Sequence, residues 1–196
     1  MTIALRYQKW QITKYATIFI AAVLTFILLA NGINEASLRI AVRFTARISC
    51  ILFILAFTAS ALHRLTANPV TNWLLQNRRY FGLSMAIAHG FHALAIAGVA
   101  VFSAENMVRD NHLAILGYVF IILMAATSFK RPAAVLGRRN WRILHTLGMY
   151  YLWLSFTFSF AKRLSESYPI YFPFVSLLIL ALGLRLLVRK NRASST

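Results

Sequence analysis

Residues 137–160 read GRRNWRILHTLGMYYLWLSFTFSF, and this stretch decides how the rest of the chain is interpreted. Its basic start is followed at once by an aromatic, apolar segment that contains one imidazole, His145. An imidazole inside a membrane is costly unless it is paired, so a histidine in such a segment predicts a functional site with a partner elsewhere in the chain.

The composition places this segment in a membrane protein. The 196 residues are 60% hydrophobic and 13% charged, and the apolar residues form long runs rather than amphipathic patterns. The formal charge of +17 comes from short basic clusters between these runs, so nucleic-acid binding is not expected. The single cysteine, Cys50, lies within an apolar run and is expected to be a buried thiol.

Six segments are long enough to cross a hydrocarbon core of about 30 Å. We therefore predict an all-α membrane protein in which residues 1–196 form one six-helix transmembrane bundle that contacts the lipid bilayer. Lys and Arg gather in the connections on the side that holds both termini, which predicts cytoplasmic termini. The predicted helices span residues 15–30, 44–62, 80–102, 112–127, 141–160 and 171–188.

Several function classes are not expected from the sequence. The glycines form neither a G-x-G-x-x-G nor a Walker pattern, so no flavin or nicotinamide site is predicted within this chain. Acidic residues are absent from the predicted membrane interior, and no internal repeat is visible, which weighs against a transporter.

Three histidines lie well inside the predicted membrane segments. His89 and His92 are three residues apart in the third segment, on nearly one helical face, and His145 lies in the fifth. Imidazoles on two helices suit a haem, whose iron each would ligate from one side. Zinc would need further thiolate or carboxylate ligands, which these segments do not supply. Hydrogen bonding between helices without any cofactor is the remaining alternative.

The depth of each histidine does not decide between His89 and His92. Counted from the start of its segment, His145 lies about 6 Å deep, while His89 lies about 14 Å and His92 about 18 Å deep. His89 is closer in depth to His145, which favours His89 as its partner. If the fifth helix begins earlier, near Pro132, His145 lies deeper, and His92 can then be its partner.

Three stretches resemble a known family. They are RFTARISCILFIL at residues 43–55, RRYFGLSMAIAHGFHAL at residues 78–94, and TSFKRPAAVLGRRNWRILHTLGMYYLW at residues 127–153. In this order the chain resembles the ferric reductase-like transmembrane domain superfamily. It is similar in particular to the small bacterial members that act as haem-binding membrane subunits of periplasmic methionine sulfoxide reductase systems. The resemblance implies a multi-pass protein of the bacterial inner membrane that binds haem b.

The resemblance also implies a set of ligands. It assigns His92, by its offset from the RR-x-x-G-L start, and His145 as the axial ligands, which leaves His89 as a neighbouring or alternate ligand. The family often has a second histidine thirteen residues after the one on the fifth helix, and Phe158 stands there in this chain. A single haem b is therefore expected.

Arg47 is a further candidate for the cofactor site. It continues Arg39 and Arg43 at four-residue intervals along one helical face, and it matches the arginine of the family's F-T-x-R motif. The resemblance points its guanidinium at a haem propionate. Snorkelling to the outer head groups is the alternative.

These expectations combine into one function. The chain is expected to be an oxidoreductase subunit that passes electrons through a bis-histidine haem. The donor would be a separate cytoplasmic flavoprotein or membrane quinol, and the acceptor a periplasmic protein or ferric complex. The alternative is a haem-free helical membrane protein that serves as an assembly or partner subunit.

Overall fold

The computed structural model describes residues 8–103 and 112–193, and within these ranges the chain is entirely α-helical. The connection 104–111, whose charges entered the topology prediction, lies outside the described residues. The helices are α1 (Trp10–Asn31), α2 (Glu35–Leu65), α3 (Pro69–Phe102), α4 (His112–Ala126), α5 (Lys130–Leu136), α6 (Arg138–Ala161) and α7 (Tyr168–Ala193).

The predicted all-helical membrane class is confirmed. Within the described part of the chain, four helices are long and apolar enough to cross a membrane, namely α1, α2, α3 and α7 over Tyr168–Lys190. The pair α4 and α5, bent by 109°, would add a fifth crossing as one broken span. Helix α6 is less apolar because arginines occupy its first turns and because imidazole and hydroxyl side chains are spread along it. The six-span topology and the cytoplasmic termini stay predictions.

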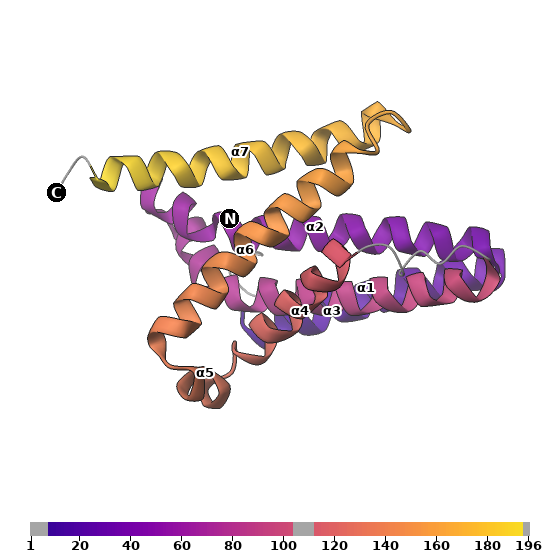
Figure 1. Ribbon diagram of the computed structural model, residues 1–196, viewed down its shortest axis with the longest axis horizontal. Coiled ribbons are helices and arrows are strands. Elements are labelled where there is room, and N and C mark those ends of the chain that lie inside the picture. Colours follow the sequence, from indigo (N-terminus) through magenta and orange to yellow (C-terminus); the bar gives the residue numbers. More distant parts are fainter. Residues whose placement is uncertain (1–7, 104–111, 194–196) are drawn as a thin grey trace.

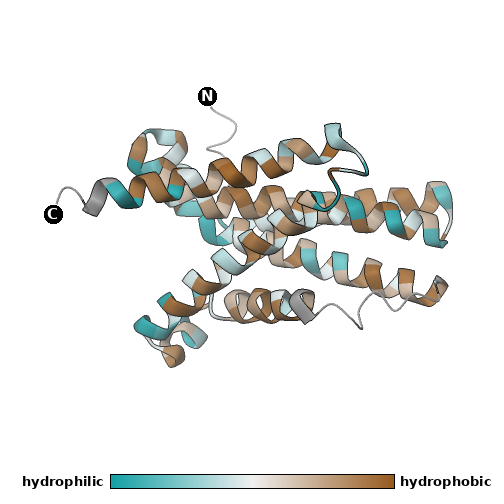
Figure 2. Ribbon diagram, turned by 45° about the horizontal axis from the view of Figure 1, so that its top comes forward, coloured by the Kyte–Doolittle hydropathy of each residue, from teal (hydrophilic) through white to brown (hydrophobic). Residues whose placement is uncertain are grey.

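Large apolar side chains on the outside of the bundle fit a lipid environment. Phe26 and Leu29 of α1 are 71% and 81% exposed, and Val101 of α3 is 82% exposed. Water would make such surfaces costly, whereas lipid tails cover them. Figure 2 shows the same pattern, with hydrophobic residues along the lengths of the helices and hydrophilic ones gathered mainly near their ends.

Helices α2 and α3 begin well before the predicted starts at residues 44 and 80, because each has a capping box. The Asn34 side chain accepts from the backbone N–H of Ser37, whose hydroxyl accepts from the Asn34 N–H. Asn68 and Thr71 repeat this arrangement, with Pro69 at the first helical position. Such caps satisfy backbone donors that a helix start leaves unpaired.

The helices form a bundle that one helix crosses (Figure 1). Helices α2 and α3 make the most extensive contact, α1 packs along α3, and α7 packs on α2. Helix α6 runs diagonally and contacts both α4 and α7. Aromatic rings fill the centre, where Phe53 of α2 lies 5.2 Å from Phe156 of α6 between ring centroids. Cys50 is fully buried beside them, as predicted.

Candidate functional site

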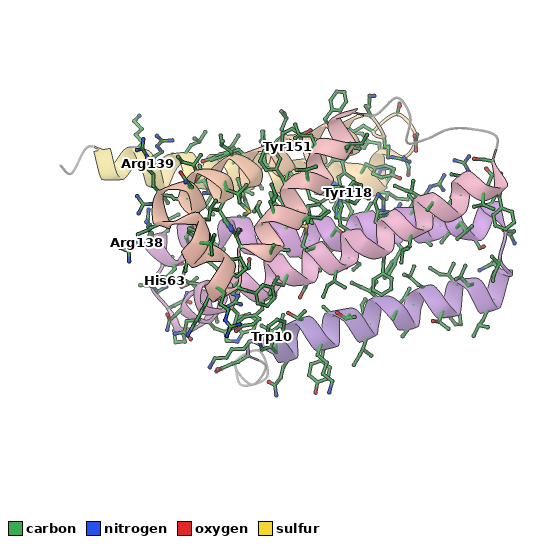
Figure 3. The ribbon with its side chains drawn as sticks, turned by 60° about the horizontal axis from the view of Figure 1, so that its bottom comes forward. Trp10, His63, Tyr118, Arg138, Arg139 and Tyr151 are labelled. Atoms are coloured by element: carbon green, nitrogen blue, oxygen red, sulfur yellow. The ribbon has the colours of Figure 1, made fainter. Side chains whose placement is uncertain are left out.

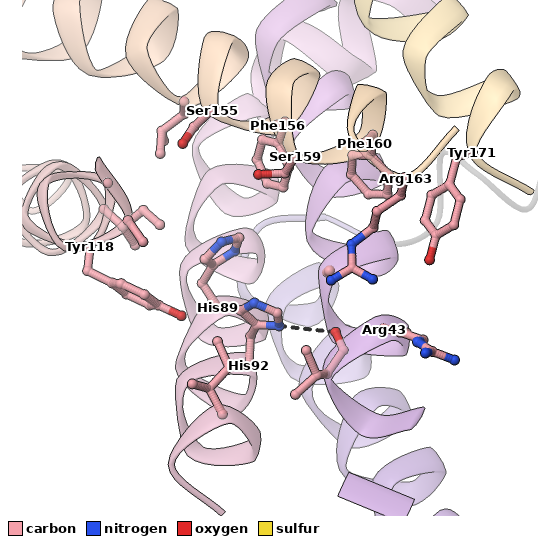
Figure 4. A pocket seen from close by; sticks show the side chains of 17 residues that line it. Arg43, His89, His92, Tyr118, Ser155, Phe156, Ser159, Phe160, Arg163 and Tyr171 are labelled. Carbon is pink, nitrogen blue, oxygen red and sulfur yellow. Dashed lines mark hydrogen bonds between the residues drawn. The ribbon is translucent and has the colours of Figure 1, made fainter. Parts of the chain in front are cut away.

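The third-helix histidines face a cavity of about 250 Å³ that we call the histidine-pair cavity. Helices α2, α3, α4 and α6 and the start of α7 form its walls (Figure 4). Most of its lining is apolar. The polar side chains that line it are Arg43, His89, His92, Tyr118, Ser155, Ser159, Arg163 and Tyr171.

His92 is held by α2 in a defined tautomer. Its Nδ1 lies 3.1 Å from the Val42 carbonyl oxygen and 3.0 Å from the Thr45 hydroxyl. A carbonyl only accepts, and the Thr45 hydroxyl donates its own proton to the Ala41 carbonyl at 2.8 Å. Nδ1 therefore carries the hydrogen, and Nε2 carries the lone pair. Metal-ligating histidines typically have this arrangement, with one nitrogen held by a backbone carbonyl and the other free to bind.

His89 packs beside His92, with 5.4 Å between their ring centroids. The ring of Tyr118 meets His89 edge-on at 5.7 Å. Among the described residues, neither the Nδ1 of His89 nor the hydroxyl of Tyr118 has a hydrogen-bond partner, although both atoms are buried. Leaving such an atom unsatisfied costs about 1–3 kcal/mol. The cavity thus contains polar atoms that a ligand would satisfy.

His145 lies in a second, larger cavity of about 510 Å³ that we call the basic cavity. It lies between α2, α3, the bend from α4 to α5, α6 and α7. Among the described residues, five basic side chains line it and no acidic side chain does. They are Arg78, Arg79, Lys130, Arg142 and Arg185.

The His145 ring is engaged by protein groups on two sides. Its Nε2 lies 3.1 Å from the hydroxyl of Thr127, which donates its own proton to the Leu123 carbonyl at 2.6 Å. Nε2 therefore donates to Thr127. The ring also stacks on Trp141, with centroids 4.3 Å apart and planes 30° apart. The nitrogen that would bind a metal most readily is thus already used in a contact between α6 and the end of α4.

The structure brings His89 and His92 together but places His145 in the other cavity. Ile121 lines both cavities and lies between them. His92 lies about 35 Å from the start of α3, and His145 lies about 10 Å from the start of α6. His92 and His145 thus line separate cavities in this structure, and their expected clamp around one iron stays a prediction.

Arg47 does not line the histidine-pair cavity. Its guanidinium lies 5.5 Å from the ring centroid of Tyr171, and its buried Nε has no hydrogen-bond partner among the described residues. Arg43, one turn earlier on α2, lines the cavity instead. Arg43 rather than Arg47 thus contributes the guanidinium of α2 to this cavity.

Two residues of the site were missed from the sequence. Thr45, the hydroxyl that contacts His92, is the threonine of the F-T-x-R motif from which only the arginine was singled out. Tyr118 is the one phenol within the apolar segment HLAILGYVFIILMAA, residues 112–126, and an isolated polar group there is a usable signal.

No family model, no curated protein and no solved structure matches this chain. The functional interpretation therefore rests on the geometry of the two cavities and on the motifs.

Proposed function

We propose that this chain is a membrane electron-transfer protein that binds one haem b through His92 in the histidine-pair cavity. The observation that carries the proposal is the hydrogen bond from His92 Nδ1 to the Val42 carbonyl, which leaves Nε2 as a free ligand on a helix that lines the cavity. When bound, haem supplies one-electron chemistry at a potential tuned by its ligands and its burial.

The side chains that line the cavity suit this group in their chemistry. Phe156 and Leu152 of α6 give it buried apolar walls. Arg43 and Arg163 line it from α2 and from the segment after α6, and guanidinium groups bind carboxylates such as propionates strongly. Arg163 also binds Glu166, with 3.2 Å between Nη1 and Oε2.

The proposal uses one protein imidazole rather than two. Across the cavity from His92, α6 contributes Ser155 and Ser159, which carry hydroxyls (Figure 4). His145 lines the basic cavity, and its Nε2 donates to Thr127. We therefore assign the iron to His92, with His89 beside it as the group that shapes the cavity.

The donor and acceptor follow from the resemblance to the ferric reductase-like superfamily. In a bacterial inner membrane, electrons would arrive from a separate flavoprotein or from quinol and leave to a periplasmic protein or ferric complex. In an oxidoreductase of this kind, partner proteins carry out the substrate chemistry. This chain would carry the electrons across the membrane.

A redox difference spectrum tests the proposal. The protein would be expressed with ample haem, purified in detergent, and recorded before and after reduction with dithionite. We expect b-type bands in the wild type and in His63→Ala, whose imidazole lies 3.4 Å from the Thr71 hydroxyl at the other end of the bundle. The bands should be lost in His92→Ala. Their absence from the wild type would refute the proposal.

A haem-free assembly or partner subunit is the second candidate, and one observation favours it. His92 joins α3 to α2, and His145 joins α6 to the end of α4, so both imidazoles already serve as bonds between helices. In that case the purified wild type would show no haem bands, and His92→Ala would lower its thermal stability. The same preparations would reveal both.

A further inference from the structure

The basic cavity carries positive charge, and no carboxylate of the described residues lines it. Its five basic side chains come from α3, from α5, from α6 and from α7, so chain segments far apart in sequence converge on it. The described ion pairs, Arg39 with Glu35 and Arg163 with Glu166, involve none of the five. Converging cations in a partly enclosed site create a potential that attracts anions.

Two of these arginines are half-buried and are held against aromatic rings. The Arg79 guanidinium lies over the rings of Phe129 and Tyr80, at 5.3 and 5.6 Å from their centroids. Its Nε is buried and has no hydrogen-bond partner among the described residues. A buried donor on a cation that lacks an acceptor is costly, which indicates that an anion belongs beside it.

Arg185 is fixed in a similar way from α7. Its guanidinium lies 4.2 Å from the ring centroid of Phe57 and 5.1 Å from that of Tyr150. One of its nitrogens, Nη1, donates to the Phe57 carbonyl at 3.4 Å. These contacts orient the planar group and reduce the entropy that it would lose when it binds an anion.

The inner part of the same cavity is apolar. Met85, Met124, Met149 and Ile121 line it together with Phe53. A ligand that fills the whole space therefore needs an anionic group at the arginines and a hydrocarbon body beyond it. In a membrane protein the abundant molecule with both is an anionic phospholipid, and basic pockets between transmembrane helices bind such head groups.

We propose that the basic cavity binds an anionic phospholipid, with Arg79 and Arg185 as ligands of the phosphate and an acyl chain against the methionines. Arg138 and Arg139, at the start of α6, are exposed on the outside of the bundle (Figure 3). This site is independent of the haem proposal, since His92 does not line it.

Fluorescence quenching tests the proposal, because Trp141 lines the cavity. Phosphatidylglycerol with brominated acyl chains would be titrated into the detergent-purified full chain, with phosphatidylcholine of the same chains as the comparison. The difference from Trp141→Phe isolates the signal of Trp141. We expect phosphatidylglycerol to bind about tenfold more tightly, because each guanidinium adds a charge-assisted bond to the phosphate. Equal affinity for the two lipids would overturn the proposal.

Two matched double variants locate the site. R79Q/R185Q should abolish the preference for phosphatidylglycerol, whereas R138Q/R139Q, with the same loss of charge outside the cavity, should retain it. Equal losses in both would indicate general surface attraction and would overturn the proposal. Inorganic phosphate should not displace the lipid, because it lacks the apolar body; displacement at equal concentration would also overturn it.

A pair of glycine variants on α3 tests the site without changing the arginines, whose replacement could impair folding. Gly82 lines the basic cavity, and a Cβ added there would meet nothing within 4 Å. Gly82→Leu should therefore fill the cavity and reduce lipid binding about tenfold in a folded protein. Gly90→Leu, on the same helix with equal space and outside both cavities, should leave binding unchanged. Full binding in Gly82→Leu would overturn the assignment.

Discussion

The Nδ1 of His92 lies 3.1 Å from the carbonyl oxygen of Val42, and this bond determines which ring nitrogen is free. His145 presents the opposite case, because its Nε2 is the nitrogen already bonded, to Thr127 at 3.1 Å. Two histidines that look equivalent in the sequence thus differ in their capacity to bind a metal. The difference arises from the neighbouring helix in each case, α2 for one and the end of α4 for the other.

This contrast predicts different effects of removing each imidazole. His145→Ala should keep its full haem content per protein, because His145 lines the other cavity, while His92→Ala should lose nearly all of it. Haem would be quantified by the pyridine haemochromogen assay on protein that elutes as a single species. Equal losses in the two variants would instead support the bis-histidine clamp expected from the sequence.

Thr127 should contribute to stability through His145. Thr127→Val removes the acceptor for Nε2 of His145 and leaves a partly buried N–H unsatisfied, which should cost about 1–2 kcal/mol. The control is Thr58→Val, since Thr58 is similarly buried and its hydroxyl donates only to the Ile54 carbonyl of its own helix. Thermal unfolding in detergent measures both. A smaller effect at Thr127 than at Thr58 would contradict a structural role for the contact.

Gly148 should be sensitive to an added side chain. A Cβ at this position would overlap the Met124 sulfur and lie 3.1 Å from the Phe120 ring, so α6 packs directly on α4 here. Gly148→Ala is expected to destabilise the protein by about 1–3 kcal/mol through overpacking. At Gly90 the same change meets open space and should stabilise by about 0.5–1 kcal/mol, since glycine weakens a helix interior. Denaturant or thermal unfolding of the pair provides the check, and a stabilised Gly148→Ala would contradict this packing.

Much of the fold follows from the sequence, for identifiable reasons. The long apolar runs predict the helices. The N-x-x-S and N-x-x-T motifs at Asn34 and Asn68 mark the starts of two of them, α2 and α3. The pairing of His89 with His92 also follows, because a spacing of three residues puts both on one helical face.

The site could not be completed from the sequence, because its parts depend on how helices cross. The level of His145 depends on where α6 begins, at Arg138, and on its diagonal path, neither of which a hydropathy pattern contains. The same holds for Arg43 and Arg47, which are one turn apart on α2 and differ only in which neighbour they meet. Local spacing predicts a face, and tertiary packing decides what that face contacts.

The position of the missing second histidine on α6 gives the most discriminating test. Counting along the chain points to Phe158, but the side chain of Phe158 is 53% exposed and does not line the histidine-pair cavity. Its neighbour Ser159 does line that cavity, on the side that faces His89 and His92 (Figure 4). A helix turns by about 100° per residue, so adjacent positions face different surroundings.

Ser159→His should therefore supply a second axial imidazole, whereas Phe158→His should not. We expect the first variant to show the sharpened bands of six-coordinate, low-spin haem and the second to keep the wild-type spectrum, since bis-histidine ligation closes both axial positions. The oxidised and reduced spectra of the two variants, with carbon monoxide binding as a measure of the open position, make the comparison. A low-spin spectrum in Phe158→His alone would mean that α6 is rotated about its axis relative to this structure.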